Sequence, residues 1–252
     1  LVGTLNVLEY SRTHGKIPVV FASSNKAYTN ITNTLPQQET PTRYEWISSF
    51  ESKGLIDLGV NKFALNELVP LDAFGHYARS LYGTSKVAGD LYCQEYYQAF
   101  GVPTVVNRMS CIYGYYQKGV EDQAWVDWFF RQIAFGDGKI NIFGSGKQVR
   151  DVLFGTDCAK LYLDEIENID KVKGKAYNIG GGIENTMSLL ETISYIEELT
   201  SKKATLSFLP KRHGDQDIWI SDISKIQMDL AWKPTVSPKE GIKMMFEEYR
   251  KL

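Results

Sequence analysis

The sequence contains few cysteines and histidines and has no long apolar segment. Its 3 Cys and 3 His are scattered through 252 residues. Neither a disulfide framework nor a zinc site matches such spacing, so we expect free thiols and no bound metal. No apolar run approaches the ~20 residues that cross a bilayer, and no signal-peptide pattern opens the sequence. We therefore expect a cytoplasmic protein.

A strong charge of either sign is also missing. The formal net charge is -2 and the pI is about 6.0, without a block of like charges. This balance argues against a nucleic-acid-binding surface and against a polybasic membrane anchor. The 43% hydrophobic content is that of an ordinary globular protein, so small molecules are the expected partners.

The glycine motifs that bind phosphates are absent. No G-x-G-x-x-G occurs between a predicted strand and helix. The three glycines at 180–182 lack the spacing, and "GSGKQ" departs from the P-loop pattern at Asn141 and Gln148. Neither glycine run identifies a phosphate site by motif alone.

The sequence does contain alternating helix and strand patterns. Residues 2–13 predict an amphipathic helix that leads into the strand "IPVVFAS". A second helix over 81–100 leads into the strand "PTVVNRM", after a long stretch rich in Asn, Thr, Pro and Gly over 25–80 that predicts a loop. A strand, loop, helix and strand of these lengths form a βαβ crossover, which predicts an α/β fold with a parallel sheet.

Beyond Gly114 the sequence predicts a smaller lobe. Its expected strands lie near 140–143 and 148–153, and its expected helices lie at 156–167, at 188–200 and from Pro238, with Ser237 as N-cap. The apolar run "AYNIGGG" predicts a strand near 176–180 that returns to the main sheet.

Two groups of polar residues in the first part of the sequence could take part in catalysis or ligand binding. Tyr82 and Lys86 are four residues apart on a predicted helix and so share a face, where the ammonium stabilises a phenolate. Ser23 and Ser24 end a predicted strand, at the edge where open α/β sheets bind ligands. The alternative is an aromatic core residue beside a solvated lysine, and the pair by itself does not exclude it.

Together, the motifs "FASSNKAY", "YGTSK", "RMSCIYG", "GKQVRDVLF" and "YNIGGG" resemble the extended short-chain dehydrogenases that act on nucleotide sugars. Among these, "EDQAWVDWFF" and "GKQVRDVL" are most similar to the CDP-paratose 2-epimerases, also called CDP-tyvelose epimerases. The resemblance implies that residues 1–112 form the C-terminal half of a Rossmann-like NAD-binding domain, and that 113–252 form an α+β lobe that binds the nucleotide sugar. It also implies that the glycine loop precedes Leu1, so that the chain is a fragment or a truncated gene product.

The resemblance further implies roles for the polar residues. Tyr82 is the expected general base, Lys86 holds the nicotinamide ribose of NAD, and Ser24 polarises the sugar hydroxyl. Ser23 and Ser110 are expected to lie against the nicotinamide.

The expected substrate site comes from the second part. Arg150 and Arg212 match the arginines that bind the diphosphate, and Asp215 matches the acid at the nucleotide ribose. The remaining expected substrate residues are Cys111, Asp122 and Gln123. The alternatives are solvated charges for these polar residues and plain helix core for "WVDWFF".

The expected function is therefore NAD-dependent epimerisation of a nucleotide sugar, of the CDP-paratose to CDP-tyvelose type. Asn25 and Lys26 stand where the related 4,6-dehydratases carry an Asp-Glu pair, which argues against dehydration. A UDP-sugar 4-epimerase and a non-catalytic regulatory or scaffold protein remain alternatives. We also expect a homo-oligomer, and an insert over 48–72 that shapes a lid over the pocket.

Overall fold

The computed structural model describes residues 1–47, 60–61, 64–69, 71 and 77–251. Most of the insert predicted as a lid lies outside these residues. Its described part pairs β4 (Val60–Asn61) with β5 (Ala64–Leu65). The Leu65 N–H donates to the Ile220 carbonyl at 2.7 Å, which fixes this end of the insert to the C-terminal part of the chain.

A three-stranded parallel sheet forms the first part of the fold. Its strands are β1 (Val19–Ser24), β6 (Thr104–Met109) and β10 (Lys175–Ile179), in the order β1-β6-β10. All six residues of β6 are buried, as expected of a parallel strand covered on both faces. The predicted α/β class with a parallel sheet is confirmed.

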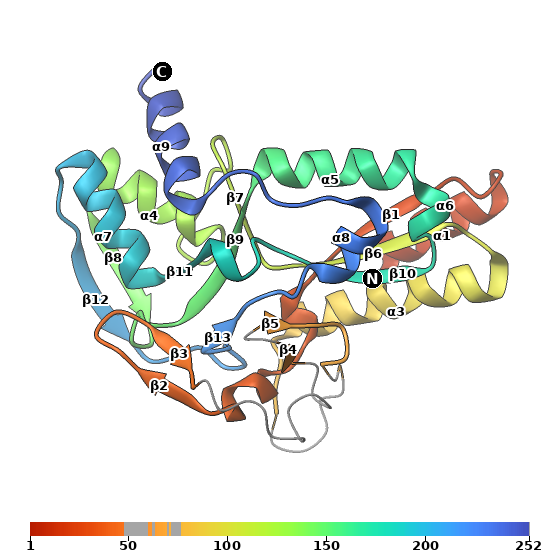
Figure 1. Ribbon diagram of the computed structural model, residues 1–252, viewed down its shortest axis with the longest axis horizontal. Coiled ribbons are helices and arrows are strands. Elements are labelled where there is room, and N and C mark those ends of the chain that lie inside the picture. Colours follow the sequence, from red (N-terminus) through yellow and green to blue (C-terminus); the bar gives the residue numbers. More distant parts are fainter. Residues whose placement is uncertain (48–59, 62–63, 70, 72–76, 252) are drawn as a thin grey trace.

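Helices cover both faces of this sheet (Figure 1). One face carries α1 (Val2–Thr13) and α3 (Leu81–Phe100), and the other carries α5 (Gly155–Glu167), α6 (Ile169–Val172) and α8 (Ser224–Leu230). Successive residues of β6 point to opposite faces, so Val106 packs with Leu8 of α1, whereas Val105 packs with Leu161 of α5. Each face therefore has its own hydrophobic core.

Local sequence signals set the bounds of α3. The Ser80 hydroxyl accepts the Gly83 N–H at 3.1 Å at the N-cap, and Gly101 ends the helix with a φ of +65°, in the left-handed region that favours glycine. A Cβ on Gly89 would lie 2.5 Å from the Phe21 ring, so the absence of a side chain lets α3 lie close to β1. The observed helix agrees with the predicted range.

The second part is built around β9 (Val149–Phe154), which pairs with three other strands. These are β7 (Cys111–Tyr113), β11 (Thr186–Ser188) and β13 (Ile218–Trp219). A separate pair joins β8 (Lys139–Phe143) to β12 (Thr205–Leu209). The helices packed around this region are α4 (Trp125–Ala134), α7 (Leu189–Thr200) and α9 (Pro238–Tyr249), with a short turn η3 (Ile183–Asn185).

The run "WVDWFF" supplies core side chains. Val126, Phe129 and Phe130 of α4 are buried in one cluster with side chains of α7 and α9. Asp127 is also buried, and its carboxylate accepts the Gly119 N–H at 2.6 Å. Helix core is therefore the right interpretation for Val126, Asp127 and Phe130, whereas Trp125 and Phe129 also line a cavity.

The prediction of a long loop over residues 25–80 was wrong for its first part. Residues 25–47 form η1 (Asn25–Ala27), η2 (Asn30–Thr34) and a hairpin of β2 (Gln37–Glu39) and β3 (Tyr44–Trp46). Tyr28 and Trp46 are buried with Trp219, and the Tyr28 and Trp219 rings stack at 4.8 Å. The turn-forming residues of this stretch predicted a loop. The local sequence does not show that its aromatic side chains pack against Trp219, which is far along the chain.

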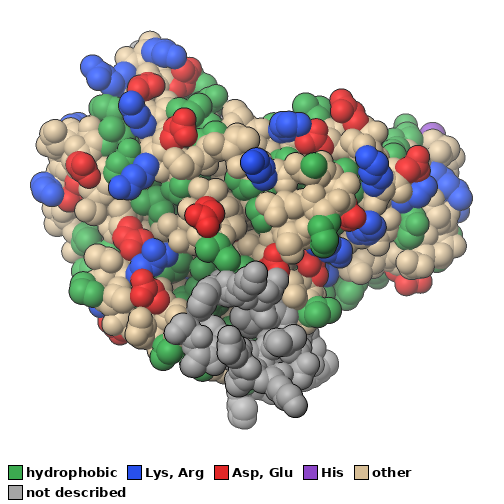
Figure 2. Space-filling view, in the orientation of Figure 1, with side chains coloured by type: hydrophobic (Ala, Val, Ile, Leu, Met, Phe, Trp, Pro, Cys, Tyr) green, Lys and Arg blue, Asp and Glu red, His purple; other side chains and the backbone are tan. Residues whose placement is uncertain are grey.

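Positive and negative side chains are interspersed over the face shown in Figure 2, in keeping with the small net charge. The three cysteines are free thiols, with Cys93 and Cys158 buried and Cys111 half-buried. Among the described residues, no helix combines the length and apolarity that a membrane crossing requires.

A buried carboxyl group lies between the main sheet and α5. The Asn107 amide N–H donates to Glu165 Oε2 at 2.8 Å, and both side chains are fully buried. Asn107 Oδ1 and Glu165 Oε1 have no hydrogen-bond partner among the described residues. Burial raises the pKa of Glu165 from 4.5 to about 7.

This raised pKa predicts a pH-dependent cost to stability. The unfolded chain loses the Glu165 proton near pH 4.5, before the folded chain does, so stability falls between about pH 4.5 and 7. We expect Glu165→Gln to raise the free energy of unfolding at pH 8 by up to about 3 kcal/mol, with little of this gain at pH 4.5. Urea denaturation at both pH values measures it, with the exposed Glu167→Gln as control. An equal effect of Glu165→Gln at both pH values would contradict the prediction.

Candidate active site

The carboxyl ends of the three parallel strands meet at one edge of the sheet. Ser24 ends β1 opposite Met109 of β6, and Met109 in turn is opposite Ile179 of β10. The Ser24 hydroxyl accepts the Lys26 N–H at 3.1 Å and so caps η1. Among the described residues, the Ser24 hydroxyl itself donates only to Asn25 Oδ1, over a long distance of 3.4 Å. This hydroxyl can therefore donate to a ligand.

Tyr82 and Lys86 lie side by side on α3, as their spacing predicts. Tyr82 is in the first turn and is 55% exposed. The Lys86 ammonium lies 5.7 Å from the centre of the Tyr82 ring and donates to the Ala22 carbonyl of β1 at 2.7 Å. Burial lowers the pKa of Lys86. The lysine thus connects the first turns of α3 to the sheet.

One turn further along the same face of α3 is a buried ion pair that sequence reasoning missed. Asp90 accepts hydrogen bonds from Arg108 Nε at 2.8 Å and from the Ser23 hydroxyl at 3.1 Å. Although burial opposes the charged form, Tyr28 and Asp90 raise the pKa of Arg108. Ser23 therefore bonds to α3, and its contact with a nicotinamide stays a prediction.

A close backbone contact places η1 beneath the first turn of α3. A Cβ on Gly83 would lie 2.0 Å from the Lys26 carbonyl oxygen, so glycine is needed at this position. Because Gly83 follows Tyr82, this contact fixes the backbone of Lys26 next to Tyr82.

A cavity of about 390 Å³ lies between the two parts of the fold, and all six predicted substrate residues line it. The predicted residues that line it are Tyr82, Cys111, Asp122, Gln123, Arg150, Arg212 and Asp215. Three other predicted residues are not part of this lining: Ser23 and Ser24 end β1, and Lys86 is in α3, one turn after Tyr82. Ser110 follows the end of β6 and does not line the cavity either; its hydroxyl donates to the Asp151 carbonyl at 2.9 Å.

Asp215 is the centre of a charge cluster in this cavity. Its Oδ1 accepts from Arg150 Nη2 at 2.9 Å and from Lys26 Nζ at 2.6 Å. Burial opposes ionisation, but Arg150 and Lys26 outweigh it and hold the pKa of Asp215 at about 2. Asp215 is therefore charged at neutral pH, and one carboxylate is shared by two cations.

Arg212 lies further out in the cavity. Its Nη2 donates to Asp122 Oδ1 at 2.6 Å, and its guanidinium lies 3.8 Å from the centre of the Phe143 ring. The Asp122 side chain is 80% exposed, so this ion pair would compete only weakly with a phosphate for Arg212.

Cys111 lines the same cavity. Burial raises the pKa of its thiol, and its sulfur accepts the Trp125 indole N–H at 3.2 Å.

Several lining residues were not predicted. They include Lys26, Phe143, Gln148 and Leu189. Lys26 could have been found from its two-residue spacing to Ser24, since a short turn after a strand keeps both at one edge of the sheet. Nothing in the sequence marks Phe143 or Leu189, because apolar residues of strands and helices usually belong to a core.

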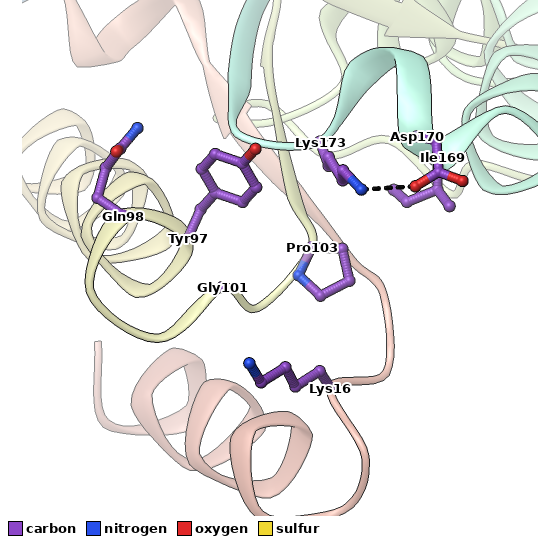
Figure 3. Close-up of a pocket in the computed structure, with 8 residues that line it drawn as sticks. All are labelled: Lys16, Tyr97, Gln98, Gly101, Pro103, Ile169, Asp170 and Lys173. Carbon is purple, nitrogen blue, oxygen red and sulfur yellow. Dashed lines mark hydrogen bonds and ion pairs between the residues drawn. The ribbon is translucent and has the colours of Figure 1, made fainter.

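A second cavity, of about 520 Å³, lies at the opposite end of α3 (Figure 3). Lys16 and Lys173 line it, and Lys173 is paired with Asp170 at 2.6 Å. It contains none of the predicted site residues, and Gly101 places it beyond the C-terminus of α3. It is therefore separate from the candidate active site.

Comparison with known proteins shows the family. Residues 62–180 match the NAD dependent epimerase/dehydratase family. The CDP-paratose 2-epimerase of Salmonella typhi is 36% identical over 97% of this chain and 69% of its own length. The chain belongs to this family of NAD-dependent enzymes, as the motifs predict.

Two further relatives show how widely the fold is shared. The dTDP-glucose 4,6-dehydratase of Haemophilus influenzae is 28% identical over 87% of this chain and 64% of its own length. The structure of UDP-glucuronic acid 4-epimerase from Bacillus cereus, in complex with UDP-glucuronic acid and NAD, has a TM-score of 0.72 at 25% identity and covers 98% of this chain and 66% of that one. The chain thus spans about two thirds of the length of these relatives.

The residues around Tyr82 fit the NAD that the family uses. The Tyr82 phenol is exposed, and the Lys86 ammonium donates one of its three N–H groups to the Ala22 carbonyl. An exposed phenol beside an ammonium with spare donors suits the hydroxyl groups of a nicotinamide ribose. The prediction of NAD as cofactor is confirmed by the family.

Proposed function

We propose that this protein epimerises a nucleotide-linked sugar through a transient keto sugar, most closely in the manner of a CDP-paratose 2-epimerase. The observation that carries the proposal is the cavity that joins Tyr82 to Arg150 and Arg212. It offers a proton-transfer group at one end and phosphate-binding cations at the other. The resemblance to the Salmonella typhi enzyme supports the choice of sugar and carbon.

In this proposal the chain's own residues handle the proton. The Ser24 hydroxyl donates a hydrogen bond to the reacting sugar hydroxyl, and Tyr82 takes the proton from that oxygen and later returns it. Lys86 stabilises the phenolate and binds the nicotinamide ribose. Bound NAD supplies the acceptor and donor for the hydrogen on carbon.

The second part of the chain binds the nucleotide. Arg150 and Arg212 bind the diphosphate, and the lining residues Asp122 and Gln123 contact the rest of the substrate. We accordingly propose the division into an NAD-binding part, 1–112, and a nucleotide-sugar-binding lobe, 113–252, with β10 returning to the main sheet.

The end of β1 favours epimerisation over dehydration. Asn25 and Lys26 follow Ser24, and η1 directs them toward the cavity, which both residues line. These side chains are an amide and an ammonium, so neither supplies the carboxylate base that a dehydratase uses. A UDP-sugar 4-epimerase would use the same residues, and the position of inversion separates the two.

The role of Tyr82 predicts the effect of removing its hydroxyl. In the NAD-loaded enzyme, Tyr82→Phe should lower turnover by about 10²- to 10⁴-fold while nucleotide-sugar affinity stays within about twofold, because general acid–base groups contribute on this scale. Steady-state kinetics and calorimetry measure both. Tyr97→Phe, at the other end of α3, is the control and should keep wild-type turnover. If Tyr82→Phe keeps more than about a tenth of the turnover, another group is the base.

The keto-sugar mechanism predicts the fate of the hydrogen on the reacting carbon. Oxidation and reduction at one carbon return the same hydrogen, whereas removal of a carbon-bound proton would admit solvent hydrogen. The product formed in D₂O should therefore carry no carbon-bound deuterium, and a CDP-sugar deuterated at C2 should keep its label and invert at C2. NMR of the product measures both. Solvent deuterium at C2 would exclude the mechanism, and inversion at C4 would exclude the 2-epimerase assignment alone.

We also propose a homo-oligomer in which α1 and α3 pack against a second copy. Apolar side chains on these helices are exposed, among them Val2 at 71%, Val7 at 53%, Leu91 at 53% and Tyr92 at 41%. Analytical ultracentrifugation should find at least a dimer, which Leu91→Glu shifts to the monomer, because a carboxylate placed in an apolar interface loses hydration. A monomeric wild-type protein would contradict this part of the proposal.

A further inference from the structure

Lys26 is a cavity residue to which neither the motifs nor the proposed mechanism gives a role in binding. Its main chain lies at the catalytic end, bonded to Ser24 and packed under Gly83. Its side chain runs toward the other end and reaches Asp215. The ammonium is therefore located between the proton-transfer group and the phosphate-binding arginines.

The charges around this ammonium are not balanced. Lys26 and Arg150 share Asp215 Oδ1, at 2.6 and 2.9 Å, so the three residues carry an excess of one positive charge. The side chain of Lys26 is 29% exposed, that of Arg150 is 7% exposed and that of Asp215 is 17% exposed. Burial lowers the pKa of Lys26 and Arg150 lowers it further, against the opposing effect of Asp215. An anionic ligand here would compensate the excess charge.

Arg150 and Lys26 also differ in how many of their hydrogen-bond donors are already bonded within the protein. Arg150 donates to the Val149 and Gln216 carbonyls at 2.8 and 2.7 Å as well as to Asp215, so most of its guanidinium is engaged within the protein. Within the described part of the chain, Lys26 Nζ donates only to Asp215. Two of its three N–H groups remain for a ligand in the cavity.

We propose that Lys26 binds the phosphate group that links the nucleotide to the sugar, and that Asp215 holds the ammonium in place for it. This inference rests on the proposed function, since it requires a nucleotide-linked sugar. The phosphate that joins sugar to nucleotide is the part of such a substrate that lies between the reacting sugar and the nucleoside. Lys26 spans the corresponding place, since its main chain packs against the turn that carries Tyr82 and its ammonium shares Asp215 with Arg150.

Calorimetric titration of nucleotides tests the assignment without turnover. The ligands are the mono- and diphosphates of cytidine and uridine, and CDP-glucose. Lys26→Met removes the charge, and Lys26→Gln keeps a donor for Asp215 should the methionine variant fold poorly. Lys147→Met is the matched control, because Lys147 forms a 2.6 Å ion pair with Glu39 at 20% exposure and does not line this cavity.

Both Lys26 variants should bind the preferred nucleoside diphosphate and CDP-glucose about 10- to 100-fold more weakly than wild type, the range for a hydrogen bond to a charged group. Affinity for the monophosphate, which lacks the sugar-linked phosphate, should change by less than about twofold. Lys147→Met should leave all affinities unchanged.

Three outcomes would overturn the proposal. Wild-type affinity of the variants for the diphosphate would show that Lys26 does not bind this phosphate, and equal losses for mono- and diphosphate would place its contact elsewhere on the nucleotide. A loss confined to CDP-glucose would show that the ammonium contacts the sugar. If the wild-type protein binds none of these nucleotides, the proposed function itself fails, which is a distinct result.

Discussion

The buried ion pair between Arg108 and Asp90 sets the position of α3 on the sheet. Arg108 lies near the end of the central strand β6, and Asp90 lies in the middle of α3. The pair extends to β1 through Ser23 and to β10 through Tyr28, whose hydroxyl donates to the Asn178 side chain at 2.7 Å. Removing one partner of a buried ion pair typically costs about 3 to 5 kcal/mol, because the other charge is left unpaired. All three strands and α3 are therefore fixed in one arrangement.

The arrangement of α3 and η1 follows from this pair together with two glycines. Gly89 lets the helix approach the Phe21 ring, and Gly83 lets the Lys26 carbonyl approach the first turn. The Lys86 ammonium adds a hydrogen bond to β1. The first turn of α3, which carries Tyr82, is thus fixed by contacts along the whole face of the helix. The second part of the chain adds Arg150 and Asp215, and the cavity forms where both parts meet.

Local signals predicted the regular elements well and the long-range contacts poorly. The bounds of α3 follow from Ser80 and Gly101, and the buried strands follow from continuous apolar runs. The stretch after β1 was predicted to be a long loop, because its turn-forming residues give no sign that Tyr28 packs against the distant Trp219. Likewise, no local pattern could pair Asp90 with Arg108, since they belong to different elements.

For the candidate site, the sequence by itself determined the chemical groups. The spacing of Tyr82 and Lys86 puts them on one helix face, and the strand before Ser24 puts its hydroxyl at the ligand-binding edge. Only the tertiary structure decided which charges meet. Lys26 and Arg150 share one carboxylate oxygen of Asp215 because three distant segments of the chain fold against each other. The strength of a Coulomb interaction depends on the distance between the charges and on their burial, and the spacing of residues in the sequence specifies neither.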